Sequence, residues 1–162
     1  MLPMLDTANH LALVRGWHSY YDPVYHLADF YDLRVKLVPY FLFYAAIHLL
    51  MLLHFSIETA NKLFLSAYLI LFPLSVLYLV RSFGRSDWLA LGGFSLAFSQ
   101  SWMYGFSSFM MGTCFTLLAI GAICRYLEAG RDRDLLALTI FNLLAFFGHI
   151  LSLVCLWRGG AF

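Results

Sequence analysis

Two sets of acidic and imidazole side chains near the start of the sequence have the spacing that proton transfer or metal binding requires. Asp6 and His10 are four residues apart, so both side chains share one face if this stretch is helical. A carboxylate beside an imidazole can share a proton or bind a divalent metal. Asp22, His26 and Asp29 repeat the pattern at spacings of four and three. A simpler interpretation stands beside this one, because Asp6 and Asp22 both occupy positions where an aspartate can cap a helix without doing chemistry.

Polar residues also lie inside otherwise apolar stretches, where they cost free energy and therefore indicate a site. Asn142, His149 and Ser152 recur at spacings of seven and three, which places all three on one face of a continuous helix. They could line a substrate cavity, with His149 as ligand or proton donor, or they could join packed helices by hydrogen bonds. His48 and His54 are six residues apart and share no helical face, which favours packing or interfacial roles.

Small and polar side chains gather around residues 99–112. Ser99, Gln100 and Ser101 stand beside Trp102 and Tyr104, where they could bind a polar head group or simply mark a helix end. Gly105, Ser108 and Gly112 share one helical face. Because small residues let two helices approach closely, we expect this face to be a packing surface.

The composition predicts that an integral membrane protein carries these residues. Of the 162 residues, 62% are hydrophobic and 12% are charged, whereas soluble domains are nearer half apolar and a quarter charged. A soluble fold of this size could not cover so much apolar surface. The formal net charge is +1, so there is no basic excess and we expect no nucleic-acid partner. The common phosphate-loop, zinc-protease and serine-hydrolase motifs are also absent from the sequence.

The opening segment, residues 1–34, is expected to lie on the membrane rather than cross it. It is rich in aromatic, His and Asp residues and has no apolar run long enough to span. The pattern predicts one helix from an Asp6 N-cap to about Tyr20, and a second that begins at Asp22 with Pro23 at its first position. Tyrosine and tryptophan suit the boundary between lipid and water, so we expect an amphipathic interfacial segment that contacts membrane lipid.

Five apolar runs over residues 35–157 predict an all-α, polytopic bundle of about four to five helices. The runs are Val35–Phe55, Leu63–Val80, Trp88–Met103, Tyr104–Cys124 and Leu135–Trp157. A helix needs about 20 residues to span, with a range of about 17–25. The last two runs meet this length plainly, the second just meets it, and the third is marginal. No repeat or linker divides the sequence, so residues 1–162 are treated as a single unit.

Loop charges predict the orientation of the bundle. The loop Arg81–Asp87 carries two arginines and the loop Arg125–Asp134 carries three. Short loops rich in Lys and Arg stay on the cytoplasmic side, so both loops are expected there. These patterns leave open whether Val35–Phe55 crosses the membrane or enters and returns. Residues 1–34 would be cytoplasmic in the first case and outside in the second.

Three stretches, in this order along the chain, resemble the GT-C membrane glycosyltransferases and their bacterial polytopic relatives, many of them uncharacterised. Residues 2–11 read LPMLDTANHL and look like an outer loop of those proteins. Residues 102–112 are similar to their W-x-x-G-F-x-x-F-x-x-G stretch, and residues 146–151 are similar to their aromatic-x-x-His-Leu stretch.

The resemblance implies the N-terminal part of a GT-C-like glycosyltransferase in the bacterial inner membrane. Such enzymes use a lipid-linked sugar, here a polyprenyl-phosphate-linked one, at the outer face. An acid early in their first outer loop activates the acceptor or binds a divalent metal, and Asp6 takes that place. The resemblance implies His10 as its catalytic neighbour, and Asn9, Tyr104 and His149 as substrate contacts. It also places the opening segment outside.

The sequence departs from the family in two respects. No transmembrane helix precedes Asp6, and no acid lies near Tyr104–Ser108, where many relatives carry a second acidic cluster. We therefore expect a fragment of a longer protein, inactive by itself. The alternative is a non-catalytic multi-pass membrane protein with a structural or interaction role. A transporter-like bundle is disfavoured, because the last four apolar runs contain no acid or lysine for ion coupling.

Overall fold

The computed structural model describes residue 4, residues 6–152 and residue 154, and within this part the chain is all helical with no strand. The elements, in order, are α1 (Thr7–His18), the 3-10 helix η1 (Leu27–Asp29), α2 (Phe41–Leu52), α3 (Ile57–Ser82), the 3-10 helix η2 (Asp87–Leu91), α4 (Gly92–Ala97), α5 (Gln100–Tyr104), α6 (Ser107–Ala129) and α7 (Asp132–Gly148). The predicted all-α class is confirmed.

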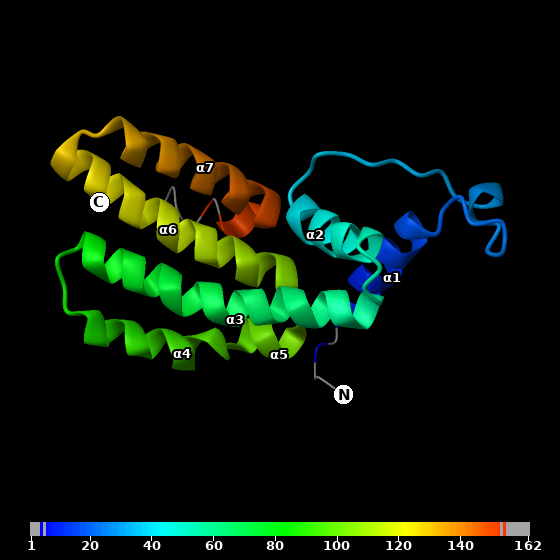
Figure 1. The fold of residues 1–162 in the computed structure, drawn as a ribbon, viewed down its shortest axis with the longest axis horizontal. Coiled ribbons are helices and arrows are strands. Elements are labelled where there is room, and N and C mark those ends of the chain that lie inside the picture. Colours follow the sequence, from blue (N-terminus) through cyan, green and yellow to red (C-terminus); the bar gives the residue numbers. More distant parts are fainter. Residues whose placement is uncertain (1–3, 5, 153, 155–162) are drawn as a thin grey trace.

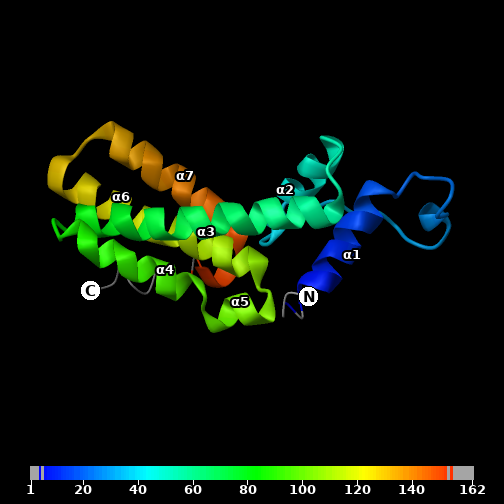
Figure 2. The ribbon, with the colours of Figure 1, turned by 60° about the horizontal axis from the view of Figure 1, so that its bottom comes forward.

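Three long helices form the main body. Helix α6 packs between α3 and α7, while η2 and α4 cover another side of α3 (Figure 1). Helices α1 and α2 lie together at one end of this body, beside the start of α3 (Figure 2). Residues 19–34, called the lobe below, extend beyond that end. The arginine-rich loops that follow α3 and α6 lie at the opposite end.

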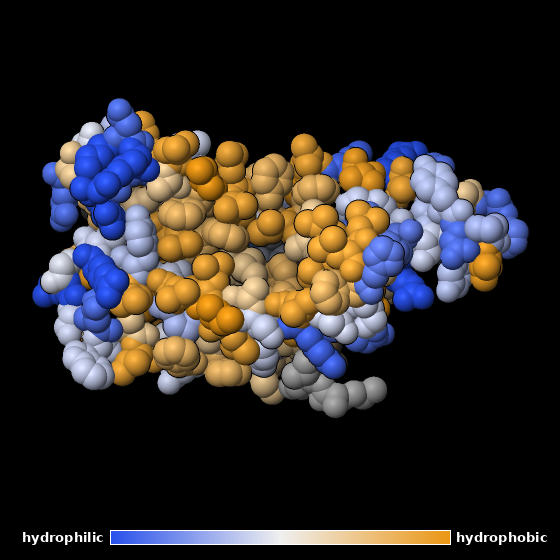
Figure 3. Space-filling view, viewed as in Figure 1, coloured by the Kyte–Doolittle hydropathy of each residue, from blue (hydrophilic) through white to orange (hydrophobic). Residues whose placement is uncertain are grey.

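Helices α3 and α6 are long and apolar enough to cross a membrane. With 26 and 23 residues, they measure about 39 and 35 Å at 1.5 Å per residue, against a hydrocarbon core of about 30 Å. On the face shown in Figure 3, the middle of the body is apolar, and hydrophilic residues gather toward its two ends. Within the described residues, these two candidate spans are fewer than the four to five that the apolar runs predict, and the end of the last run, beyond residue 154, lies outside the described residues.

Local backbone features shorten the other runs. The first run yields only α2, whose 12 residues measure about 18 Å and cannot cross as a helix. Tyr40 precedes α2 in a left-handed conformation with φ of 79°, and His54 follows it with φ of 67°. The third run is divided into η2, α4 and α5. In the last run, α7 ends at Gly148 because His149 is extended, with φ of −165°.

The two helices predicted for the opening segment have different outcomes. Helix α1 begins directly after Asp6, as predicted, and ends at His18, two residues before the predicted end at about Tyr20. The second predicted helix, beginning at Asp22, is wrong. The Asp22 carboxylate accepts the backbone N–H of Val24 in a tight turn, and His26 has a left-handed backbone with φ of 50°. Both features interrupt a helix, and only the short η1 forms.

Candidate functional site

Asp6 is fixed by its backbone, while its side chain is free of the capping role. The Asp6 backbone N–H donates to the carbonyl of Tyr104 at 3.0 Å, and no side-chain hydrogen bond caps α1. The carboxylate Oδ2 instead accepts from His10 Nε2 at 2.9 Å. Because the two residues are four apart in α1, helical geometry alone brings them together. The contact that the spacing predicts is confirmed.

His10 also contacts a residue far away in the sequence. Its Nδ1 lies 2.6 Å from the hydroxyl of Tyr44 in α2. A carboxylate only accepts, and a neutral imidazole carries one N–H. His10 therefore donates from Nε2 to Asp6 and accepts the Tyr44 proton at Nδ1. Burial, together with the nearby Asp6 and Tyr40, raises the pKa of Tyr44, which keeps its hydroxyl a donor at neutral pH.

The start of α1 is anchored to the turn between α5 and α6. The hydroxyl of Thr7, a buried residue, donates to the carbonyl of Gly105 at 3.0 Å. Gly105 has φ of 79°, and a Cβ added there would collide with the Thr7 hydroxyl and with Met4. The position therefore requires glycine, both for its backbone and for its closeness to α1. This anchor sets where Asp6 stands relative to α6.

Asp6 and His10 open into a pocket of about 600 Å³, called the Asp6 pocket below. Elements distant in the sequence complete its lining, namely Tyr40, Ser101, Phe106, Phe109, His149 and Leu151. The pocket therefore combines one acid and two imidazoles with aromatic walls. This mixture of a mainly apolar lining and a few convergent polar groups is typical of small-molecule sites.

His149 reaches the pocket because α7 ends before it. Its ring lies edge-on to Tyr40 and Phe109, at centroid distances of 4.5 and 5.4 Å. The backbone N–H of Leu151 donates to His149 Nδ1 at 3.1 Å. A neutral His149 therefore carries its proton on Nε2, which makes that nitrogen a hydrogen-bond donor.

The single polar face predicted for Asn142, His149 and Ser152 is wrong. The extended backbone at His149 breaks the helix, so the spacing of seven and three no longer aligns the three side chains. Ser152 is 2% exposed, and its carbonyl accepts from Thr116 in α6 at 3.0 Å. Of this set, His149 alone lines the Asp6 pocket.

The other two predicted substrate contacts lie outside the Asp6 pocket. Asn9 is exposed and lines a separate hollow against the lobe. Tyr104 contributes its backbone carbonyl to Asp6, while its ring stacks on Phe106 at 5.7 Å. Their roles as substrate ligands stay predictions of the family resemblance.

Sequence reasoning missed Tyr40 and Tyr44, which complete the site. Both lie in an apolar run 30 or more residues after His10, and no spacing rule links them to α1. One signal was present, since two tyrosines four residues apart in an apolar run share a helical face. The left-handed backbone at Tyr40 leaves Tyr44 inside α2 and Tyr40 just before it.

The residues present do not form a metal-binding set. Within residues 4, 6–152 and 154, no group of three or more His, Cys, Asp or Glu side chains lies close enough to hold a metal ion. Asp6 already uses one carboxylate oxygen for His10. The second predicted set, Asp22, His26 and Asp29, does not converge on one point either. His26 lies 3.3 Å from Asp29 on the exposed lobe, while the Asp22 carboxylate accepts the backbone N–H of Val24.

Comparison with known proteins leaves the site to be interpreted from its own geometry. No family model, no curated protein and no solved structure matches the chain.

Proposed function

We propose that this chain is part of a GT-C-like membrane glycosyltransferase that transfers a sugar from a lipid-linked donor at the outer face of the bacterial inner membrane. The observation that carries the proposal is the Asp6 pocket itself. It is lined both by the Asp6 carboxylate, which is held by His10, and by His149, from a distant part of the sequence. The substrate class comes from the family resemblance. The pocket contributes a carboxylate, Asp6, that can accept a proton from a bound acceptor.

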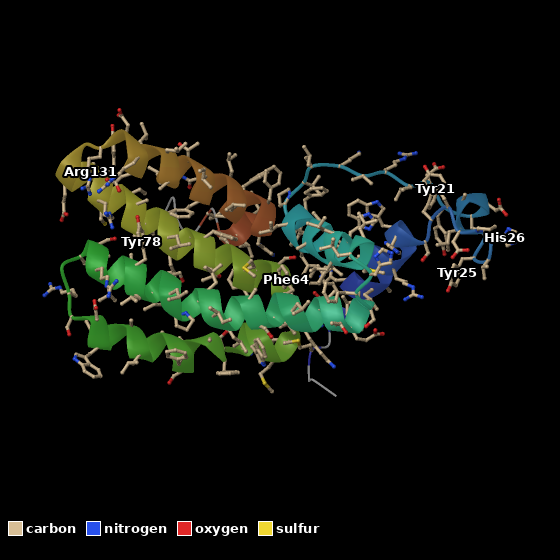
Figure 4. All side chains as sticks on the ribbon, viewed as in Figure 1. Tyr21, Tyr25, His26, Phe64, Tyr78 and Arg131 are labelled. Carbon is tan, nitrogen blue, oxygen red and sulfur yellow. The ribbon has the colours of Figure 1, made fainter. Side chains whose placement is uncertain are left out.

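The position of the pocket along α6 supports the proposed orientation. Phe106 and Phe109, at the start of α6, line the pocket, whereas Arg125 and Arg131 lie at its other end. Figure 4 places Arg131 at the opposite end of the molecule from Tyr25 in the lobe. If the arginine loops face the cytoplasm, the pocket lies about 35 Å away, at the outer boundary of the membrane.

Asp6 acts as the general base in this proposal. The acceptor oxygen forms a bond to the anomeric carbon of the sugar, and its proton passes to Asp6. The bond from that carbon to the lipid phosphate oxygen breaks, and the electron pair leaves with the phosphate. The Oδ2 atom is held by His10, which leaves Oδ1 to receive the proton. A positioned base of this kind contributes about 10²- to 10⁴-fold to a rate.

His149 and Tyr44 support this step in different ways. The Nε2–H of His149 can donate to a phosphate oxygen and stabilise the leaving group. Tyr44 does not line the Asp6 pocket, and it acts through His10 by holding that imidazole with its proton toward Asp6. His149 is therefore a substrate contact, and Tyr44 is a positioning residue.

The test is sugar transfer by the full-length protein that contains this chain, in its native membrane, with radiolabelled polyprenyl-phosphate sugars as donors. Asp6→Asn should lower lipid-sugar-dependent transfer by about 10²- to 10⁴-fold. Asp29→Asn is the matched control, because this acid lies on the exposed lobe and outside the Asp6 pocket; it should leave transfer unchanged. Equal transfer by the parent protein and Asp6→Asn would contradict the proposal.

One observation favours a second candidate, a non-catalytic multi-pass membrane protein of structural or interaction role. The hydrogen bonds from Tyr44 to His10 and from His10 to Asp6 also join α2 to α1. These bonds would have the same geometry if their sole role were to hold the two helices together. Under this alternative, Asp6→Asn lowers the unfolding temperature of the chain in detergent, while no donor sugar is ever transferred.

A further inference from the structure

Tyr44 lines a hollow that is separate from the Asp6 pocket. It has a volume of about 360 Å³ and lies between α1, α2 and the segment that connects the lobe to α2. We call it the 33–38 groove, because Leu33, Arg34, Val35, Lys36 and Val38 form one wall. Leu13 and Trp17 of α1, with Phe41 and Tyr44 of α2, form the others. Two cations thus lie beside aliphatic and aromatic side chains.

The positive charge of this groove is largely uncompensated. Arg34 is 3.2 Å from Asp32, but these side chains are 71% and 82% exposed, so the pair is weak. Lys36 forms no ion pair with any acid in the described part of the chain. The groove therefore offers two cationic donors that an anionic ligand could occupy.

The aliphatic residues next to these cations are also uncovered. Val35, Leu37 and Val38 are 52%, 71% and 47% exposed, on a segment with no regular helix or strand. The segment runs from the lobe back to the start of α2, which lies beside the end of α7 (Figure 1). It therefore passes from the polar end of the molecule toward the apolar body. Exposed aliphatics interleaved with Arg and Lys suit the head-group zone of a membrane, where the stems lie in lipid and the charges reach phosphate.

We propose that the 33–38 groove binds the phosphate head group of an anionic membrane phospholipid. Its phosphate oxygens accept hydrogen bonds from Arg34 and Lys36, and its acyl chains follow the uncovered aliphatics toward the apolar body. An anionic lipid is preferred to a zwitterionic one because no choline-like cation has to be placed beside Arg34 and Lys36. The groove shares no lining residue with the Asp6 pocket, so the proposal stands whether or not the chain transfers sugar.

The groove contains its own reporter in Trp17. The full chain is reconstituted in vesicles containing either brominated phosphatidylglycerol or brominated phosphatidylcholine, since bromine on the acyl chains quenches nearby tryptophan fluorescence. The difference in quenching between the parent chain and Trp17→Phe isolates Trp17 from the other tryptophans. We expect brominated phosphatidylglycerol to quench Trp17 at a concentration about 10- to 30-fold lower than brominated phosphatidylcholine. This is the difference in affinity expected when two cations contact an anionic lipid.

The double variant Arg34→Gln/Lys36→Gln should abolish this preference. The matched control is Arg85→Gln/Arg133→Gln, which removes the same charge from two exposed residues at the opposite end of the molecule and should keep the preference. Equal quenching by the two lipids, or a preference that survives the double variant, would overturn the proposal. Inorganic phosphate at the same concentration should not compete. Displacement of the brominated lipid by free phosphate, or tenfold better by polyprenyl phosphate than by phosphatidylglycerol, would also overturn it, because the site would then belong to another ligand.

Discussion

The hydroxyl of Tyr44 donates to Nδ1 of His10 across 2.6 Å, and this bond decides which nitrogen of His10 faces Asp6. With Nδ1 occupied as an acceptor, the remaining proton of the neutral imidazole lies on Nε2 and points to the carboxylate. The arrangement resembles the way catalytic carboxylate–histidine pairs are oriented by a third group. It also joins two helices, so its removal has consequences for both stability and tautomer.

Tyr44→Phe should destabilise the chain and loosen the orientation of His10. A lost hydrogen bond of this kind costs about 1 kcal/mol, and the freed Nδ1 lets His10 populate its other tautomer. Thermal unfolding in detergent measures the first effect, and the nitrogen chemical shifts of a histidine-labelled chain measure the second. Tyr21→Phe is the control, because Tyr21 is 85% exposed. A His10 tautomer that is the same in Tyr44→Phe and in the parent chain would show that Tyr44 does not position it.

Gly148→Ala should destabilise the contact between α6 and α7. A Cβ on Gly148 would lie 2.7 Å from the Cα of Gly112, and neither backbone can move aside cheaply. Overpacking of this kind costs about 1–3 kcal/mol, measured as a lower unfolding temperature in detergent. Gly16→Ala is the matched control, since a Cβ there meets nothing within 4 Å inside α1. It should instead stabilise by about 0.5–1 kcal/mol. Equal effects of the two substitutions would contradict the close approach of the helices.

Asp134 should make the stability of the arginine end depend on pH. Burial alone raises its pKa, but a hydrogen bond from Arg131 at 2.8 Å and the charges of Arg131, Arg125 and Arg133 outweigh burial and hold the pKa of Asp134 below its ordinary value. A folded pKa below the unfolded one stabilises the fold above the ordinary aspartate pKa of about 3.9. That contribution is lost as the pH falls through the lower folded value.

Asp134→Asn should therefore lower the unfolding temperature near neutral pH. The difference from the parent chain should shrink as the pH falls from about 5 toward 3. Asp132→Asn changes an exposed acid in the same first turn of α7 and should show little of this dependence. A difference between Asp134→Asn and the parent that grows on acidification would contradict the ion-pair account.

The proposed orientation predicts which residues a membrane-impermeant thiol reagent can reach. Cysteines introduced at Ser86 and Glu128, in or beside the two arginine loops, should react only when the cytoplasmic side is opened. A cysteine at Tyr25, in the lobe, should react in intact cells. Labelling is scored above that of the parent chain, which has its own cysteines. Labelling of Ser86→Cys from outside would reverse the orientation and place the Asp6 pocket in the cytoplasm.

The sequence predicted those parts of the site that depend on local periodicity. The spacing of Asp6 and His10 predicted their contact, and the small-residue face predicted the close approach at Gly112. Gly105 does not belong to that face, because it lies in the turn before α6 with a left-handed backbone. Both depend only on the 3.6-residue repeat of a helix, which the sequence displays directly.

The parts that were missed depend on breaks in the backbone and on contacts between distant segments. The apolar composition continues unchanged through Tyr40 and His149, yet the chain turns sharply at the first and leaves its helix at the second. These breaks bring Tyr40 and His149 to the same pocket. Pro39 and Gly148 directly precede the two breaks and can interrupt a helix, but neither residue predicts that the two segments meet. Within the described residues, two helices are long enough to cross a membrane, and the four to five that the apolar runs predict stay a prediction.

The most direct test of the proposed function is a double-mutant cycle on Asp6 and His10, with lipid-sugar-dependent transfer as the readout. If His10 acts only by holding Asp6, then His10→Gln lowers transfer by the full-length parent protein but has no further effect in Asp6→Asn. The account predicts that the double variant transfers sugar at the same residual rate as Asp6→Asn alone. The account would be contradicted if the loss of transfer in the double variant equalled the product of the two single losses, or if Asp6→Asn transferred sugar at the parent rate.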